Sequence, residues 1–513
     1  MKLLPAKFIL KGILFACITG FLFATFQTLP KNREEHWNWK EIDHENITFP
    51  DWFKFGVATS EYQLSGNKNS TDPKKIIDSN WAIFERTKDW FGNPYTPAAG
   101  KGVDHWSLFK QDIQLVKNLG VTVYRLSLDW ARIEPQQGVI NTRALKHYHN
   151  LFDECAKNGI TPIVTLHHFV EPAWFTKKGG FEKEGNIQYF VSFALQMVKE
   201  FSSKVSTWAT INEPGVYAVM GYIFGDFPPG KRLRFAQAGR VIENLLKAHL
   251  NVYKAIKDLP EGNKLEVGIV HNIVQFDPYH PNNPIERWFT GYLNHIFSDA
   301  ILTALKTGTF SFSTPLTTIY WHNPALVSSY DFFGLNYYSH VLFNILHPYE
   351  PVFRPETDEV KTDLQYGLYA EGLYRAIKAA SSLNVPIYIT ENGLADAKDI
   401  LRDRWYRRYL YATHKAIQDG YDVRMFCAWS LMDNYEWNHG YDKQFGLYHV
   451  DRTTQKRTLR PGAEYFKQVA TKHHLKPPAK KETSREQNVS NTSFIEEPFF
   501  GINEMGSTEI IAS

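Results

Sequence analysis

Short runs of β-branched and aromatic residues alternate along the middle of this chain with longer segments of helical period. The runs at residues 53–59, 121–127, 160–166, 205–211, 267–270, 332–336, 386–390 and 423–429 are expected to be strands. Between them lie segments such as 187–201, whose apolar residues recur at three- and four-residue spacing, as on one face of a helix. Eight such alternations predict an α/β fold, a single (β/α)8 TIM barrel.

The N-terminus carries a targeting signal of its own. Lys2, Lys7 and Lys11 precede a charge-free, mostly apolar run at residues 12–29, which is just long enough to cross a bilayer at about 1.5 Å per residue. Residues 1–30 are therefore expected to be an uncleaved signal anchor or, alternatively, a cleaved signal peptide. The positive charge before the run predicts a membrane-anchored protein with a lumenal or extracellular body, which would be secreted if cleavage occurs.

The remaining organisation follows from composition. Residues 31–50 are polar and are expected to be a linker, residues 51–473 the barrel, and residues 474–513 a disordered tail rich in Lys, Glu, Ser, Asn and Pro. Four Asn-x-Ser/Thr sequons agree with a lumenal or extracellular location and lie at Asn46, Asn69, Asn488 and Asn491.

Charge and cysteine content narrow the possible partners. The formal net charge is only +3, from 57 basic and 54 acidic residues without a basic stripe, so nucleic acid is not an expected partner. The three cysteines cannot form a disulfide framework. His167 and His168 lack further ligands at metal spacing, and no nucleotide-binding glycine loop is found, so we expect neither a metal nor a cofactor. The oligomeric state stays open.

Two glutamates lie just after expected strands. Glu391 precedes the sharp turn at Asn392 and Gly393, and Glu213 precedes Pro214, which ends its strand. Active sites of (β/α)8 barrels lie at the carboxyl ends of the strands. A pair of carboxyl groups there can protonate a glycosidic oxygen and stabilise the sugar cation, so we interpret the pair as glycosidase carboxylates. The alternative for either residue alone is a structural salt bridge at the barrel rim.

Five separated motifs, all in the order expected, strengthen this interpretation. They are the segment 55–63 (FGVATSEYQ), the segment 124–132 (YRLSLDWAR), the segment 210–214 (TINEP), the segment 389–393 (ITENG) and the segment 429–437 (WSLMDNYEW). With these motifs the chain resembles glycoside hydrolase family 1 over about residues 52–470. Features near Trp81 and after the second glutamate look more like the archaeal and plant galactolipid-remodelling branches.

The resemblance implies roles for individual residues. Glu391 would be the nucleophile and Glu213 the acid/base, with Arg125 and Tyr338 holding the nucleophile. The residues implied to bind the sugar are Gln63, His168, Asn212, Asn336, Trp429, Glu436 and Trp437. No cofactor is implied.

The expected activity is that of a retaining exo-β-glycosidase acting on β-linked glucose- or galactose-type sugars. A transglycosylase acting on glycolipid is the alternative within catalysis, and a non-catalytic klotho-like binding module is the alternative outside it. The presence of both glutamates argues against the binding module. Phe169 and Phe181 stand where the family usually has tryptophan, which leaves the sugar preference open.

Overall fold

The structure is a computed structural model that describes residues 34–68, 76–88, 92–314, 317–348, 350, 352–354 and 358–474. The expected signal anchor at 1–30 lies outside these ranges, as does the expected tail at 474–513 apart from His474. In the described ranges, no helix has both the length and the apolar character needed to span a bilayer.

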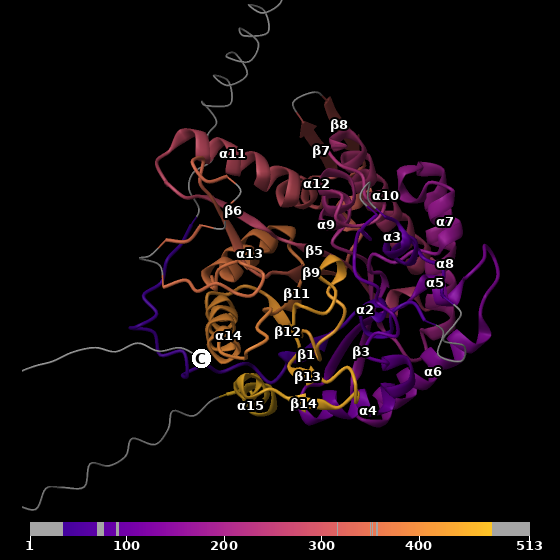
Figure 1. The fold of residues 1–513 in the computed structure, drawn as a ribbon, viewed down its shortest axis with the longest axis horizontal. Coiled ribbons are helices and arrows are strands. Elements are labelled where there is room, and N and C mark those ends of the chain that lie inside the picture. Colours follow the sequence, from indigo (N-terminus) through magenta and orange to yellow (C-terminus); the bar gives the residue numbers. More distant parts are fainter. Residues whose placement is uncertain are drawn as a thin grey trace, which may run out of the picture. The chain divides into compact units, whose positions relative to one another are not determined.

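Eight parallel strands close into a barrel in the order β1, β12, β11, β9, β5, β4, β3, β2 (Figure 1). The strands are β1 (Lys54–Ala58), β2 (Val123–Ser127), β3 (Thr161–His167), β4 (Thr207–Asn212), β5 (Glu266–Asn272), β9 (Phe332–Asn336), β11 (Ile387–Asn392) and β12 (Val423–Trp429). Each overlaps one of the predicted strands, and closure occurs where β12 pairs with β1. The predicted barrel is confirmed.

Burial explains why these strands read as continuous apolar runs. Every residue of β2, β4, β9 and β11 is buried, because side chains fill the barrel interior while helices cover its outer face. The register shifts where β11 begins, between Ile387 and Tyr388, and again near two carboxyl ends. It shifts between Ala209 and Asn212 of β4 and between Ile389 and Glu391 of β11. Such irregularities redirect side chains, and those at the carboxyl ends fall beside the two candidate glutamates.

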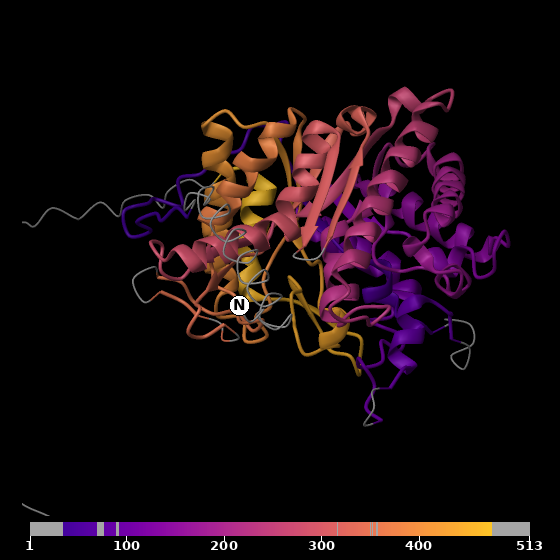
Figure 2. The same ribbon diagram turned by 90° about the horizontal axis from the view of Figure 1, so that it is seen from above.

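Helices surround the strands (Figures 1 and 2). The longer ones are α4 (His105–Asn118), α6 (Thr142–Lys157), α8 (Ile187–Phe201), α10 (Phe235–Lys257), α11 (Pro284–Asn294), α12 (Ala300–Thr307), α13 (Glu371–Ala380), α14 (Arg402–Gln418) and α15 (Glu464–Lys472). The bounds of α8 are those predicted from its apolar spacing. Shorter helices are α2 (Glu61–Ser65), α3 (Asn80–Arg86), α5 (Trp130–Ile133), α7 (Ala173–Lys177) and α9 (Pro214–Val219).

Three two-stranded sheets lie outside the barrel. They pair β6 (Gln275–Pro278) with β10 (His340–Phe343), β7 (Thr309–Thr314) with β8 (Thr317–His322), and β13 (Tyr448–Val450) with β14 (Arg457–Leu459). The first pair is parallel and the other two are antiparallel. The β6–β10 pair matters for the site, because both strands continue the chain just beyond the ends of barrel strands β5 and β9.

The segment expected as a linker packs on the barrel from Glu34 onward. The backbone N–H of Trp37 and the indole N–H of Trp39 both donate to Oε1 of Glu371 in α13, each at 3.0 Å. The two indole rings also contact Tyr411 of α14, with ring centroids 5.9 and 5.8 Å away. These contacts bury Trp39 and attach the segment to the outer surface of α13 and α14.

Candidate active site

A cavity of about 240 Å³ lies where the carboxyl ends of the barrel strands meet. Seven of the predicted site residues line it, namely His168, Glu213, Tyr338, Glu391, Trp429, Glu436 and Trp437. The other four, Gln63, Arg125, Asn212 and Asn336, are fully buried and hydrogen-bond directly to these or to one another. The structure thus brings all the predicted side chains into one site.

Glu391 ends β11 with both carboxylate oxygens engaged. Nη1 of Arg125 donates to Oε1, and the hydroxyl of Tyr338 donates to Oε2 at 2.6 Å. The guanidinium is completely buried, so the ion pair is shielded from water and its attraction is little screened. The two donors balance the buried charge and fix the direction in which the carboxylate faces.

The turn after Glu391 is held by tertiary contacts. Asn392 donates to the carbonyl of Tyr337 at 2.7 Å and accepts from the indole N–H of Trp405 at 2.9 Å. Gly393 approaches the backbone of β12 so closely that a Cβ would lie 1.7 Å from the carbonyl oxygen of Trp429. A side chain at position 393 would therefore displace either the turn or β12.

Glu213 lies in a different environment. Its backbone is left-handed, with φ of 46°, and its N–H donates to the carbonyl of Val270 at 2.8 Å before Pro214 begins α9. A non-glycine residue in this region is uncommon and is typical of functional sites. Asn336 donates to its Oε1 at 2.7 Å. Burial, and then the negative charge of Glu391, raise the pKa of Glu213 to about 8.

A hydrogen-bonded network connects the two glutamates. Nη2 of Arg125 donates to Oδ1 of Asn212 at 2.7 Å, and Asn336 donates to the same oxygen at 3.3 Å. Because Arg125 contacts Glu391 and Asn336 contacts Glu213, one buried network orients both carboxyl groups. His168 lies 3.3 Å from Asn212, and burial with the nearby Arg125 charge lowers its pKa well below the usual range, which keeps the ring neutral.

The opposite wall of the cavity combines a third carboxyl group with aromatic rings. Gln63 donates to Oε2 of Glu436 at 3.3 Å, and burial followed by the charge of Glu391 raises the pKa of Glu436 to about 8. The rings of Trp429 and Trp437 flank His168 at centroid distances of 5.9 and 6.0 Å. Flat rings beside hydrogen-bonding groups suit a sugar, whose faces are apolar and whose edges carry hydroxyls.

Several lining residues were not predicted from the sequence. Val341, Leu364, Tyr366 and Phe445 line the cavity from segments that follow the strands. Nothing in their local sequence marks them, because Val341 lies on a short strand outside the barrel and the other three lie in loops, which show no periodicity that reports the direction of a side chain. His167, which was expected just after a strand at 160–166, instead ends β3 and packs against Phe181, with ring centroids 5.2 Å apart.

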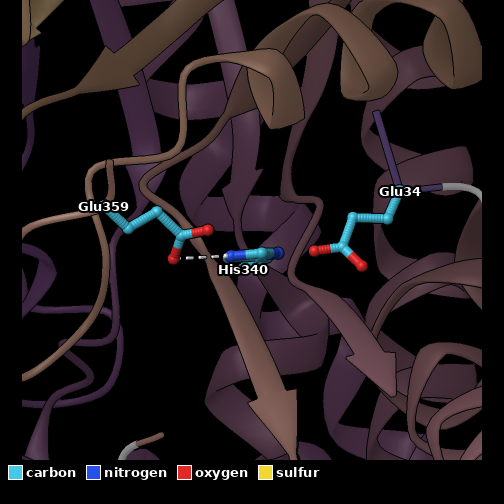
Figure 3. Close-up of side chains that lie close together, drawn as sticks. All are labelled: Glu34, His340 and Glu359. Atoms are coloured by element: carbon cyan, nitrogen blue, oxygen red, sulfur yellow. Dashed lines mark hydrogen bonds and ion pairs between the residues drawn. The ribbon is translucent and has the colours of Figure 1, made fainter. Parts of the chain in front are cut away.

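A second polar cluster, shown in Figure 3, lies beside the cavity and contains Glu34, His340 and Glu359. His340 contacts Oδ2 of Asp277 at 2.8 Å through Nδ1 and Oε2 of Glu359 at 3.2 Å through Nε2. Burial would lower its pKa, but these two carboxylates outweigh burial and raise it to about 9. A protonated ring donates from both nitrogens, one to each carboxylate.

Comparison with known proteins agrees with the geometry. The sequence profile of glycosyl hydrolase family 1 matches residues 45–475. β-Glucosidase A of Thermotoga maritima is 31% identical over 455 residues, which cover 83% of this chain and 98% of that protein. A 6-phospho-β-galactosidase of Staphylococcus epidermidis is 31% identical over 479 residues, covering 83% and 99%. A β-glycosidase structure from Pyrococcus horikoshii is similar with a TM-score of 0.73 and 35% identity, covering 84% of this chain and 97% of that one.

A closed parallel barrel with buried glutamates facing one cavity at its carboxyl end, together with these relatives, defines an O-glycosyl hydrolase. The chain belongs to glycosyl hydrolase family 1. The predicted family and enzyme class are thereby confirmed, whereas the predicted nearness to the archaeal and plant branches stays a prediction.

Proposed function

We propose that this enzyme is a retaining exo-β-glycosidase that removes terminal β-linked glucose- or galactose-type sugars by double displacement. The observation that carries the proposal is the unequal environment of the two glutamates. Glu391 is paired with a buried guanidinium and a phenol, which suits an ionised nucleophile. Glu213 has a pKa raised to about 8, so it holds a proton near neutral pH and suits a general acid.

The reaction then proceeds in two displacements. Glu213 protonates the leaving oxygen while a carboxylate oxygen of Glu391 attacks the anomeric carbon, forming a glycosyl-enzyme ester. Glu213, now deprotonated, removes a proton from a water molecule that attacks the same carbon and releases Glu391. Two inversions give net retention of configuration. Once Glu391 is esterified, it no longer carries a negative charge. The pKa of Glu213 is then lower, which favours the role of Glu213 as a base in the second step.

The charge of the cavity favours an unphosphorylated sugar. Some relatives are 6-phospho-β-galactosidases. In this chain the carboxyl groups of Glu213, Glu391 and Glu436 face the cavity, and among the described residues neither Lys nor Arg lines it. Arg125, behind the wall, already contacts Glu391 and Asn212. A phosphate would meet the negative charge of Glu391 without a free cation to balance it, whereas sugar hydroxyls can hydrogen-bond to Glu436.

Transglycosylation of a glycolipid is the second candidate. Water and a sugar hydroxyl can attack the same glycosyl-enzyme, and residues 12–29 would hold the barrel at a bilayer, with a lumenal or extracellular location as the proposed topology. Products formed from a β-glycosyl lipid at increasing lipid concentration distinguish the two outcomes. If the enzyme transfers the sugar to lipid, an oligoglycosyl lipid should appear. If only free monosaccharide is released at every lipid concentration, transglycosylation is excluded.

Replacement of the nucleophile tests the proposed mechanism. Glu391→Ala is expected to lower kcat for an aryl β-glucoside by about 10⁴-fold or more, because the covalent step is lost. Azide, which fits the vacated space, should restore part of the turnover and give a glycosyl azide of inverted configuration. Glu266→Gln, at the opposite end of the barrel where β5 begins, is the matched control and should retain activity. Undiminished activity in Glu391→Ala would refute the assignment.

A further inference from the structure

Six apolar side chains, three of them exposed and three half-buried, form a surface patch beside the active-site cavity, which we call the α11 patch. It consists of Ile285, Trp288 and Phe289 of α11, Phe343 at the end of β10, and Ile345 and Leu346 just beyond it. Ile285 is 48% exposed and Leu346 is 75% exposed. None of the six belongs to the hydrophobic core clusters of the described residues. Figure 1 shows α11 at the periphery of the fold.

The patch is a built surface rather than scattered side chains. The rings of Phe289 and Phe343 lie 4.4 Å apart, which joins α11 to β10. The backbone N–H of Ile345 donates to Oε1 of the buried Glu286 at 3.0 Å, which fastens the loop after β10 to the first turn of α11. Contiguous exposed apolar surface of this kind marks a binding surface.

An apolar path connects the patch to the reaction centre. Val341 and Phe343 are two residues apart on β10 and therefore project from the same face of the strand. Val341 is 44% exposed and lines the cavity that contains Glu213 and Glu391. Val341 and Phe343 also line an adjacent cavity of about 290 Å³. Apolar surface thus runs from the catalytic carboxyl groups to the α11 patch.

The described chain begins on this same side. Arg354 pairs with Glu34 at 2.6 Å and donates to the carbonyl of Tyr279, a few residues before α11, at 3.1 Å. Glu35 and Arg287 of α11 line one cavity of about 480 Å³. Residue 29, the last of the apolar run, is five residues before Glu34 and so lies within about 18 Å of it.

We propose that the α11 patch rests on a lipid bilayer into which residues 12–29 insert, and that the cavity takes β-glycosides whose apolar aglycone is presented by that bilayer. The inference builds on the proposed glycosidase function and names its substrate class. Aromatic and branched apolar side chains on an exposed helix face suit the boundary between headgroups and acyl chains. The apolar run ends too close to α11 for the patch to lie far from the bilayer surface.

An environment-sensitive fluorophore at position 346 tests the contact. Leu346→Cys is labelled in the full chain carrying Cys17→Ser, since Cys155 and Cys427 are buried and unreactive. In phosphatidylcholine vesicles we expect a blue-shifted emission that brominated lipids quench. Ile400→Cys, whose residue is 74% exposed against 75% for Leu346, is the matched control and should show neither effect. Equal responses at both positions would overturn the proposal. An emission shift that increases with protein concentration and is not quenched by brominated lipid would also overturn it, because it would indicate that a second copy of the chain covers the patch.

Activity gives an independent test. The double variant Ile285→Asp, Leu346→Asp changes only exposed side chains and should fold normally. We expect it to hydrolyse a β-glucosyl lipid in vesicles at least fivefold more slowly than the unmodified chain, with unchanged rates on a soluble aryl β-glucoside; Ile400→Asp should change neither. An unchanged lipid-to-aryl ratio overturns the docking surface alone. Absence of activity of the unmodified chain on both an aryl β-glucoside and an aryl β-galactoside overturns the proposed function instead.

Discussion

Glu391 and Glu213 have the same side chain, but different hydrogen-bond donors give the two carboxyl groups different properties. Glu391 receives a guanidinium and a phenol, whereas Glu213 receives one amide and has the negative charge of Glu391 as a neighbour. Burial raises the pKa of Glu213, whereas Arg125 donates a hydrogen bond directly to Glu391 and acts on Glu213 only through space. In the proposed mechanism, this difference lets one site provide both an acid and a nucleophile.

The raised pKa of Glu213 predicts the alkaline side of the pH profile. The acid must carry its proton, so activity is present below its folded-state pKa and is lost as the pH rises through that value. Because burial and the charge of Glu391 raise this pKa to about 8, kcat/KM for an alkyl β-glucoside should fall above about pH 8. If kcat/KM instead fell as the pH rose through about 5, the range of an ordinary glutamic acid, the result would contradict the role assigned to Glu213.

Removal of the acid separates its contribution from that of Glu436, whose pKa is also raised to about 8. Glu213→Gln should slow the hydrolysis of substrates with poor leaving groups far more than that of activated aryl glucosides, because only the former need the proton. On an activated substrate whose slow step is glycosylation, the alkaline limb should disappear if Glu213 causes it. Its persistence would assign the limb to Glu436.

The hydroxyl group of Tyr338 is expected to contribute to catalysis. Tyr338→Phe removes the donor to Oε2 of Glu391 and leaves the ring in place. Loss of one hydrogen bond to a charged group costs about 1.5–3 kcal/mol, so kcat should fall roughly 10- to 100-fold. Tyr374→Phe, which removes a hydroxyl on the outer surface of α13, is the control measured in the same steady-state assay. Equal kcat values in the two variants would show that Tyr338 does not support the nucleophile.

At the scale of elements, the ends of β4 and β11 differ from the rest of the barrel. The register of β4 shifts just before Asn212, and that of β11 shifts just before Glu391. A turn held in place by Asn392 and Gly393 follows Glu391. Regular pleating would alternate side chains strictly between the interior and the helices. The irregularities allow neighbouring residues at one strand end to share the cavity and its supporting network.

Gly393→Ala tests the importance of this turn. The added Cβ would lie 1.7 Å from a backbone oxygen of Trp429, a contact that only movement of β11 or β12 can relieve. We expect a lower thermal midpoint and at least a tenfold loss of kcat, because both Glu391 and Trp429 would shift. Gly185→Ala, where a Cβ meets nothing within 4 Å, should match the unmodified enzyme in calorimetry and assay. Normal behaviour of Gly393→Ala would mean that the turn tolerates displacement.

Part of this arrangement could be predicted from the sequence. Strands such as β9 and β12 and the helix α8 were predictable because burial imposes an apolar pattern with a period. Glu213 and Glu391 were predictable because strand ends and motifs mark them. Leu364, Tyr366 and Phe445 were not, since a loop residue reaches the cavity through tertiary packing that leaves no local pattern. The same holds for Trp405, which supports Asn392 from α14.

At the scale of the molecule, residues 34–50 are part of the folded body. Its polar composition suggested a linker, but Trp37 and Trp39 bind Glu371 and pack against Tyr411. Arg408 adds a cation–π contact 4.8 Å from the ring of Trp39. A bilayer anchor attached to such a segment would be coupled to the barrel through fixed contacts rather than through a flexible tether.

Trp39→Ala measures the strength of that attachment. The side chain is 8% exposed, and truncation of a buried tryptophan typically costs about 3–5 kcal/mol of unfolding free energy. Because the segment lies on the surface of α13 and α14, we expect Trp39→Ala to lower the free energy of unfolding, measured with urea, by about 3 kcal/mol. Trp52→Ala, at a residue that is 54% exposed, should cost less than about 1 kcal/mol. Similar losses in the two variants would show that the segment is only loosely attached.

The stereochemistry of the first-formed product tests the proposed double displacement most directly. Proton NMR during the first minutes of hydrolysis of an aryl β-glucoside by the unmodified enzyme resolves the two anomers of the released sugar before mutarotation mixes them. Attack by Glu391 followed by water predicts that β-glucose appears first and α-glucose only later. Initial release of α-glucose would mean a single displacement by water, and would contradict the nucleophilic role of Glu391.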